Sequence, residues 1–97
     1  MDKRKYLEKY FTDLRSIMNF DEEKIQNLIS VSEILLNANK NGKKTLIFGN
    51  GGSAAIASHF SVDITKNARV RCVNYNESDL LTCFSNDFGY ERWVEKC

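Results

Sequence analysis

A glycine-rich turn marks the first place where this chain could do chemistry. Gly49, Gly51 and Gly52 follow the short apolar run 45–48 and precede a helical pattern. A strand that ends in glycines and turns into a helix gathers backbone N–H groups at the positive end of the helix dipole, where phosphate or another anion binds. Ser53 can cap this helix or donate its hydroxyl. Turns of this kind are also common connectors with nothing bound, so the pattern favours a ligand site without naming the ligand.

The spacing of the glycines also fits a second class of ligand. Gly49, Gly51 and Ala54 satisfy the G-x-G-x-x-G/A fingerprint of dinucleotide-binding domains. That fingerprint is normally followed, about twenty positions later, by an acidic residue that binds the ribose. Here Asn74 stands near the second strand's end and Glu77 comes late. The match to dinucleotide-binding domains is therefore weak.

A histidine and a carboxylate follow on the next helix. His59 and Asp63 are four residues apart and so share one helix face. Such a pair can transfer protons or supply two ligands of a metal ion. A surface contact between them without any catalysis fits the same spacing. Asn86 and Asp87 form a turn signal that is open to the same two interpretations.

Two amphipathic helices are predicted before the glycine turn. Apolar residues recur at helical spacing from Leu7 to Met18 and again from Ile25 to Leu36. Asp21 is a suitable N-cap for the second helix, and Gly42 is its expected stop. We expect the two helices to pair as an antiparallel hairpin over residues 1–42, whose apolar face also packs on a second copy of the chain.

The remaining residues, 43–97, alternate between strand and helix patterns. The expected elements are a strand buried on both faces at 45–48, a helix at 54–67, a strand within 68–75, a short helix at 78–84, a loop at 86–89 and a helix from 90. This order is typical of an α/β fold with a parallel sheet. Because two parallel strands do not complete a sheet, we expect a single partial domain with a thin core.

Composition limits the classes of function. The 97 residues carry 14 Lys and Arg against 13 Asp and Glu, a net charge of +1 that gives no basic surface for nucleic acid. No apolar run suits a membrane helix or a signal peptide, which predicts a cytoplasmic protein without a membrane partner. Cys72, Cys83 and Cys97 form no C-x-x-C pair and are expected to be reduced thiols.

Two segments together indicate a family. GNGGSAAIASHF at 49–60 and NDFGY at 86–90 closely resemble the sugar isomerase (SIS) domain of phosphoheptose isomerases, also called sedoheptulose 7-phosphate isomerases. The resemblance covers the whole chain and corresponds to the N-terminal half of that domain. It implies a flavodoxin-like α/β sandwich around a parallel sheet, assembled as a homotetramer with active sites between subunits, while the helical hairpin alone would allow a dimer or a tetramer. It also implies interconversion of sedoheptulose 7-phosphate and D-glycero-D-manno-heptose 7-phosphate for lipopolysaccharide or capsule biosynthesis.

The resemblance also assigns roles by position. The residues that would contact or border the sugar phosphate are Asn50, Gly51, Gly52, Ser53, Asn86 and Asp87. His59 would be a zinc ligand in members that bind zinc. The family carries a Glu four residues after that His, as base and metal ligand, where this chain has Asp63. Asp63 is one methylene shorter, about 1.5 Å, and a displacement of about 1 Å can cost on the order of a hundredfold in rate.

The resemblance leaves two functions open. The family's phosphate loop and its further catalytic residues would lie beyond Cys97, so we expect these 97 residues to be a truncated, inactive form of the isomerase. The alternative is a non-catalytic SIS-domain protein that binds a sugar phosphate or acts in assembly of a partner. The replacement of Glu by Asp63 gives this alternative weight.

Overall fold

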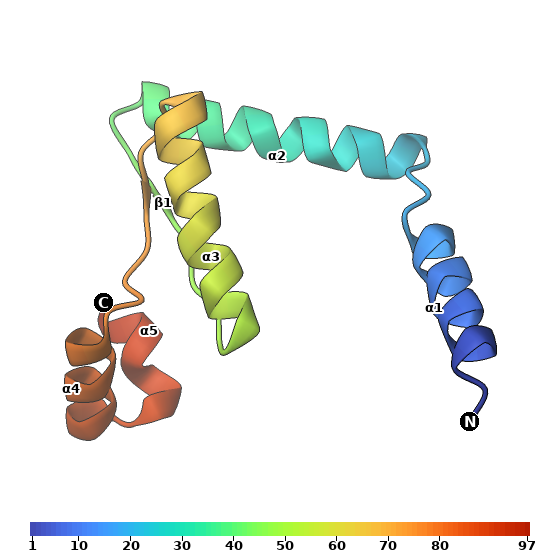
Figure 1. The fold of residues 1–97 in the computed structure, drawn as a ribbon. Coiled ribbons are helices and arrows are strands. Elements are labelled where there is room, and N and C mark those ends of the chain that lie inside the picture. The colour runs from blue at the N-terminus through green and yellow to red at the C-terminus, as the bar shows by residue number, and fades with distance from the viewer. The chain divides into compact units, whose positions relative to one another are not determined.

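The computed structural model describes every residue from Met1 to Cys97, in two compact units, Met1–Ser32 and Glu33–Cys97. The elements, in chain order, are α1 (Lys3–Ile17), α2 (Glu22–Lys40), β1 (Thr45–Leu46), α3 (Gly52–Asp63), the π-helical turn η1 (Ile64–Ala68), β2 (Cys72–Val73), α4 (Ser78–Phe88), the 3-10 turn η2 (Tyr90–Arg92) and α5 (Trp93–Lys96) (Figure 1). The chain is therefore a helix-rich partial α/β fold with a small parallel sheet, as predicted. None of its helices has both the length and the apolar content needed to cross a bilayer.

The ends of the first two helices follow from capping residues. Asp2 accepts hydrogen bonds from two backbone N–H groups of the first turn of α1, at 3.0 and 3.3 Å, so this helix begins before the apolar pattern does. Asp21 caps α2 by accepting from the backbone N–H of Lys24 at 2.9 Å, and the chain leaves the helix just before Gly42. The predicted cap and stop are confirmed. Neither helix buries a residue in this chain, and their pairing over residues 1–42 stays a prediction.

The sheet consists of β1 and β2, which run parallel. Thr45 pairs with Cys72 and Leu46 with Val73, and α3 makes the crossover between the strands. Both strands are two residues long and so shorter than the predicted ones, and the helix after the glycine turn continues as a π-helical turn to Ala68. The expectation of a first strand buried on both faces is wrong for this chain. Leu46 remains 47% exposed, because a two-stranded sheet offers few neighbouring atoms to cover it.

The core lies in the second unit and is thin. Its buried hydrophobic residues are Ala57, Val70, Cys72 and Trp93. Phe48, just after β1, packs edge-on against Trp93 of α5 with ring centroids 5.6 Å apart, and its ring lies 6.1 Å from that of Tyr75. This aromatic cluster joins the end of β1 to the C-terminal helix, so it positions the residues that follow each strand.

Helix α4 extends further than its sequence predicts. The expected loop at 86–89 is wrong, because the helix continues to Phe88 and ends at Gly89, which has φ 90°. Phe84 and Phe88, one helical turn apart, pack edge to face with ring centroids 5.7 Å apart. That pair stabilises the last turn against the turn preference of Asn86 and Asp87. These two candidate site residues therefore lie on a helix.

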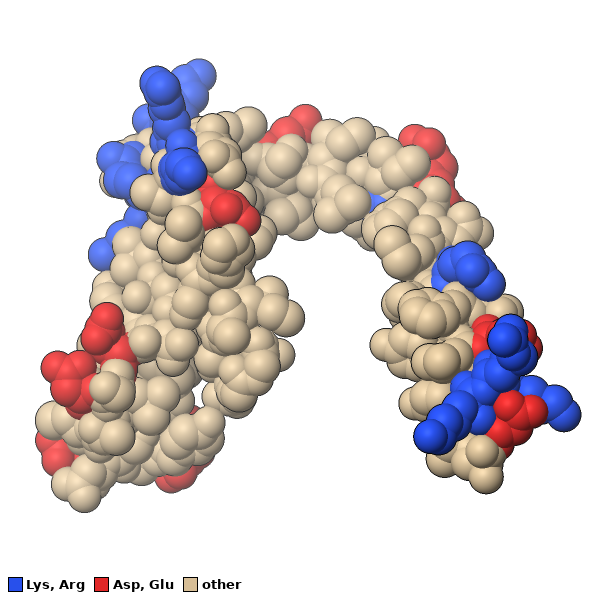
Figure 2. Space-filling model, viewed as in Figure 1, with Lys and Arg blue, Asp and Glu red and all other residues tan.

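Charged side chains of the second unit gather in two places on the face shown in Figure 2. Figure 2 shows Lys and Arg gathered where α2 and η1 end, and Asp and Glu near α4 and α5. Arg71, the residue before β2, has a structural role. Its backbone N–H donates to Asn39 Oδ1 at 3.1 Å, and its Nε donates to the carbonyl oxygen of Lys43 at 3.1 Å. Arg71 therefore joins the start of β2 to the end of α2.

Candidate functional site

The glycine turn connects β1 to α3 with little room for side chains. Gly51 is the N-cap residue of α3 and has φ 54°, a left-handed conformation that favours glycine. A Cβ atom at Gly49 would lie 2.3 Å from the backbone oxygen of Ser53. Both glycines are therefore required by the backbone itself. Capping by the Ser53 hydroxyl, one of its two expected roles, is wrong, because no side chain caps α3 and Ser53 lies inside the helix.

A cavity of about 330 Å³ lies beside this turn. Its lining residues are Gly49, Asn50, Gly51, Ala54, Ala55, Asn76, Leu81 and Tyr90. The Tyr90 hydroxyl donates a hydrogen bond to Asn50 Oδ1 at 2.8 Å across it. None of the lining side chains is charged, so the polar groups that the cavity offers are amides, backbone groups and one phenol. Such a surface suits hydroxyl groups of a ligand.

A network of polar side chains fixes one wall of this cavity. Asn74 donates from Nδ2 to the carbonyl oxygen of Ile47 at 2.8 Å and accepts at Oδ1 from Ser58 Oγ at 3.2 Å. Asn76 donates from Nδ2 to the same Ser58 Oγ at 3.0 Å. The network joins the carboxyl ends of both strands to α3. Ligands of parallel α/β sheets bind at such carboxyl ends, and this rule could have identified Asn76 from the sequence.

His59 and Asp63 share one face of α3, as their spacing predicts. His59 Nε2 lies 3.6 Å from Asp63 Oδ2, and the side chains are 77% and 54% exposed. That distance is too long for a hydrogen bond. Neither residue lines the cavity. The structure therefore brings the two residues together but does not bring them to the glycine turn.

A zinc ion would need more ligands than this pair. Zinc sites in proteins use three or four side-chain ligands. No group of three or more His, Cys, Asp or Glu side chains converges anywhere in this structure. His59 and Asp63 supply two donors, so the residues of this chain do not form a zinc site by themselves.

Asn86 and Asp87 are exposed on the last turn of α4 and do not line the cavity. Asp87 accepts from Asn86 Nδ2 at 3.2 Å and from the Cys83 thiol, with Sγ and Oδ2 3.7 Å apart. The negative charge of Asp87 raises the pKa of Cys83, with a smaller contribution from burial. Of the NDFGY segment, it is Tyr90 that reaches the cavity, and the sequence alone assigned it no role.

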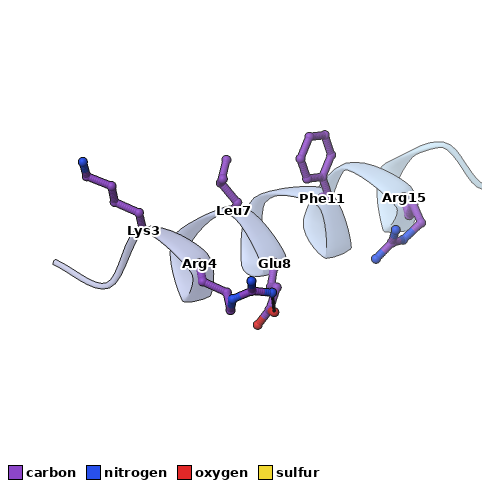
Figure 3. Close-up of a pocket in the computed structure, with 6 residues that line it drawn as sticks. All are labelled: Lys3, Arg4, Leu7, Glu8, Phe11 and Arg15. Atoms are coloured by element: carbon purple, nitrogen blue, oxygen red, sulfur yellow. Dashed lines mark ion pairs between the residues drawn. The ribbon is translucent and has the colours of Figure 1, made fainter.

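A larger hollow, of about 540 Å³, runs along α1 alone. Figure 3 shows Leu7 and Phe11 projecting to the same side of the helix, while Arg4 and Glu8 form an ion pair at 3.8 Å. Because a single helix supplies every lining residue, no polar groups converge from different elements. This hollow is exposed helix surface with an apolar stripe, and the site remains at the glycine turn.

Comparison with known proteins points to sugar isomerases. The SIS domain family matches residues 9–83. The phosphoheptose isomerase of Sodalis glossinidius is 37% identical over 93 residues, covering 84% of this chain and 48% of the relative. A probable phosphoheptose isomerase of Thermoplasma acidophilum is 35% identical over 98 residues, which cover 94% of this chain and 50% of the relative. The phosphoheptose isomerase of Aquifex aeolicus is 32% identical over 83 residues, which cover 79% of this chain and 44% of the relative. The chain thus spans about half the length of these relatives.

Proposed function

The chain belongs to the SIS domain family, and on that premise we propose that it contributes to a sugar-phosphate isomerase of the phosphoheptose isomerase type. The reaction would interconvert sedoheptulose 7-phosphate and D-glycero-D-manno-heptose 7-phosphate. The observation that carries this proposal is the glycine turn with Asn50 at an uncharged cavity, in a chain similar to phosphoheptose isomerases. Asn50, Gly51 and Gly52 would contact the substrate, with Ser53 beside them on α3, whereas Asn86 and Asp87 do not line this cavity.

The chemistry requires proton transfer between neighbouring carbons. In an aldose–ketose isomerisation one carbon loses a proton while the neighbouring carbonyl oxygen gains one, which gives an enediol. The other hydroxyl then loses its proton and the second carbon gains one, so substrate and product are isomers. It therefore needs a base and an acid, each typically contributing a factor of about 10² to 10⁴. We assign these roles to the Asp63 carboxylate and the His59 imidazole. A zinc ion could be held by this pair only with donors from outside these residues, and no step is assigned to one.

We propose that these 97 residues are the N-terminal part of a longer, full-length protein and that they are inactive alone. Their titratable pair lies outside the cavity, and the cavity contains no charged group that would bind the phosphate. We propose that the active form is a homo-oligomer, dimer or tetramer, which uses the exposed apolar residues of α1 and α2. A cytoplasmic location and a role in lipopolysaccharide or capsule biosynthesis belong to the same proposal.

A second candidate is a non-catalytic SIS-domain protein that binds a sugar phosphate or acts in assembly. The position of His59 and Asp63 outside the cavity favours this candidate, as does the shorter Asp63 side chain. Incubation of the full-length protein with sedoheptulose 7-phosphate, followed by chromatographic separation of the heptose phosphates, distinguishes the two. Product formation supports the isomerase. Calorimetric binding of the sugar phosphate without product supports the binding protein.

A further inference from the structure

Tyr90 and Asn50 form the hydrogen bond that joins the NDFGY segment to the glycine turn. The Tyr90 hydroxyl donates to Asn50 Oδ1 at 2.8 Å, across 40 positions of sequence. Asn50 stands within the glycine turn, whereas Tyr90 opens η2 after α4. Both residues line the same cavity. Their contact is therefore made at the place where a ligand would bind.

This hydrogen bond determines which way the Asn50 carboxamide faces. A carboxamide has an acceptor oxygen and an N–H₂ donor group, so a partner on one atom leaves the other for a ligand. Tyr90 occupies Asn50 Oδ1, and Asn50 Nδ2 has no hydrogen-bond partner in the structure. The group left for a ligand is thus a donor, which suits the oxygen of a hydroxyl or a carbonyl.

A second lining residue has the opposite polarity. Asn76 Nδ2 is engaged by Ser58 Oγ at 3.0 Å, so Asn76 Oδ1 is the side-chain atom that remains as an acceptor. A hydroxyl both donates and accepts, and a cavity with one free donor and one free acceptor is complementary to it. Since no lining side chain carries a charge, the cavity fits the sugar part of a sugar phosphate better than its phosphate.

We propose that Tyr90 is a positioning residue, which orients the Asn50 carboxamide so that its N–H₂ group binds a hydroxyl or carbonyl oxygen of the sugar. This inference rests on the proposed function for its ligand, a sugar phosphate. Tyr90 is 54% exposed, so loss of its hydroxyl removes a hydrogen bond without opening a hole in the core. The role of Tyr90 can therefore be tested without unfolding the protein.

The first test observes the carboxamide itself. In the full-length protein labelled with ¹⁵N-asparagine, Tyr90→Phe removes the hydroxyl and keeps the ring. Tyr6→Phe is the matched control, because Tyr6 is 56% exposed and its hydroxyl makes no hydrogen bond in the structure. The Asn50 side-chain N–H₂ signals should shift in Tyr90→Phe and stay in place in Tyr6→Phe. Unchanged Asn50 signals in Tyr90→Phe would overturn the inference, whatever the protein binds.

The second test measures the Kd of sedoheptulose 7-phosphate by calorimetry in a double-mutant cycle. Tyr90→Phe should weaken binding about threefold to tenfold, and should have no further effect once Asn50→Ala is present. Equal losses in both backgrounds, or no loss in either, would overturn the positioning role. Failure of the proposed function gives a different result. The unmutated protein would then not bind the sugar phosphate, although the Asn50 signals would still shift in Tyr90→Phe. This result would refute the sugar phosphate as the ligand.

Discussion

At the residue scale, Gly49 shows how tightly the backbone of the turn folds back on α3. An added Cβ would meet the backbone of Ser53 at 2.3 Å, and backbone cannot move aside as a flexible side chain can. Gly49→Ala should therefore lower the free energy of unfolding by about 3 kcal/mol. Gly52 is the control, because an added Cβ there would meet nothing within 4 Å. Gly52→Ala should raise stability by up to about 1 kcal/mol, since it replaces a helical glycine. Denaturant unfolding measures both, and equal effects would refute the close approach at Gly49.

The proton-transfer role of Asp63 leads to a kinetic prediction. In the full-length protein, Asp63→Asn removes the base without changing the shape of the side chain, and kcat should fall by a factor of about 10² to 10⁴. Asp13→Asn is the matched control, because Asp13 is also exposed and also lies beside a basic side chain four residues away, with Lys9 Nζ at 2.6 Å. The unfolding midpoint should change little in either variant. Full activity in Asp63→Asn would exclude Asp63 as the base.

The sequence predicted some site residues better than others, for physical reasons. His59 and Asp63 come together as expected because the geometry of one helix decides it. Tyr90 reaches the cavity through the packing of separate elements, which no local pattern encodes, whereas Asn76 follows a strand end, where ligands of parallel sheets bind. Asn86 shows the converse, since its motif predicts a site residue but its side chain does not line the cavity.

At the element scale, the Asp21 cap predicts that the stability of helix α2 depends on pH. Asp21 accepts from the backbone N–H of Lys24 at 2.9 Å and pairs with its Nζ at 3.0 Å. These contacts lower the pKa of Asp21 from 3.8, the backbone hydrogen bond contributing most. A lowered pKa means that the charged carboxylate stabilises the folded helix. The stabilisation is present above pH 3.8 and is lost as the pH falls through the lowered value.

Far-UV circular dichroism at decreasing pH checks this dependence. Asp21→Asn keeps an acceptor at the cap but has no carboxylate to titrate. Helicity should fall more steeply in the unmutated chain than in Asp21→Asn as the pH drops below 3.8. Identical curves would mean that the cap does not respond to the charge of Asp21.

The elements also show where sequence patterns reach their limit. Caps are local, so the start of α2 could be predicted from Asp21 alone. The end of α4 depends on a ring–ring contact between Phe84 and Phe88, which overcomes the turn preference of the residues between them. Strand lengths depend on how many neighbours a sheet has, and so the predicted run at 45–48 is shorter as β1.

At the scale of the whole molecule, the apolar faces of the first two helices predict self-association. Leu7 and Phe11 are each 50% exposed on α1, and no residue of α1 or α2 is buried in the single chain. Exposed apolar surface of this extent marks an interaction site. Light scattering coupled to size exclusion should find a dimer or tetramer, and Phe11→Lys should shift it toward monomer. Thr12→Lys, at the neighbouring position, should not. A stable monomer in the unmutated protein would contradict the proposed assembly.

The isomerase itself is tested most directly by a ¹H NMR time course of the full-length protein with sedoheptulose 7-phosphate, with the isolated 97-residue chain measured in parallel. We predict that the full-length protein produces the anomeric signals of D-glycero-D-manno-heptose 7-phosphate and that the 97-residue chain does not. The absence of these signals from the full-length protein at saturating substrate would contradict the proposed isomerase.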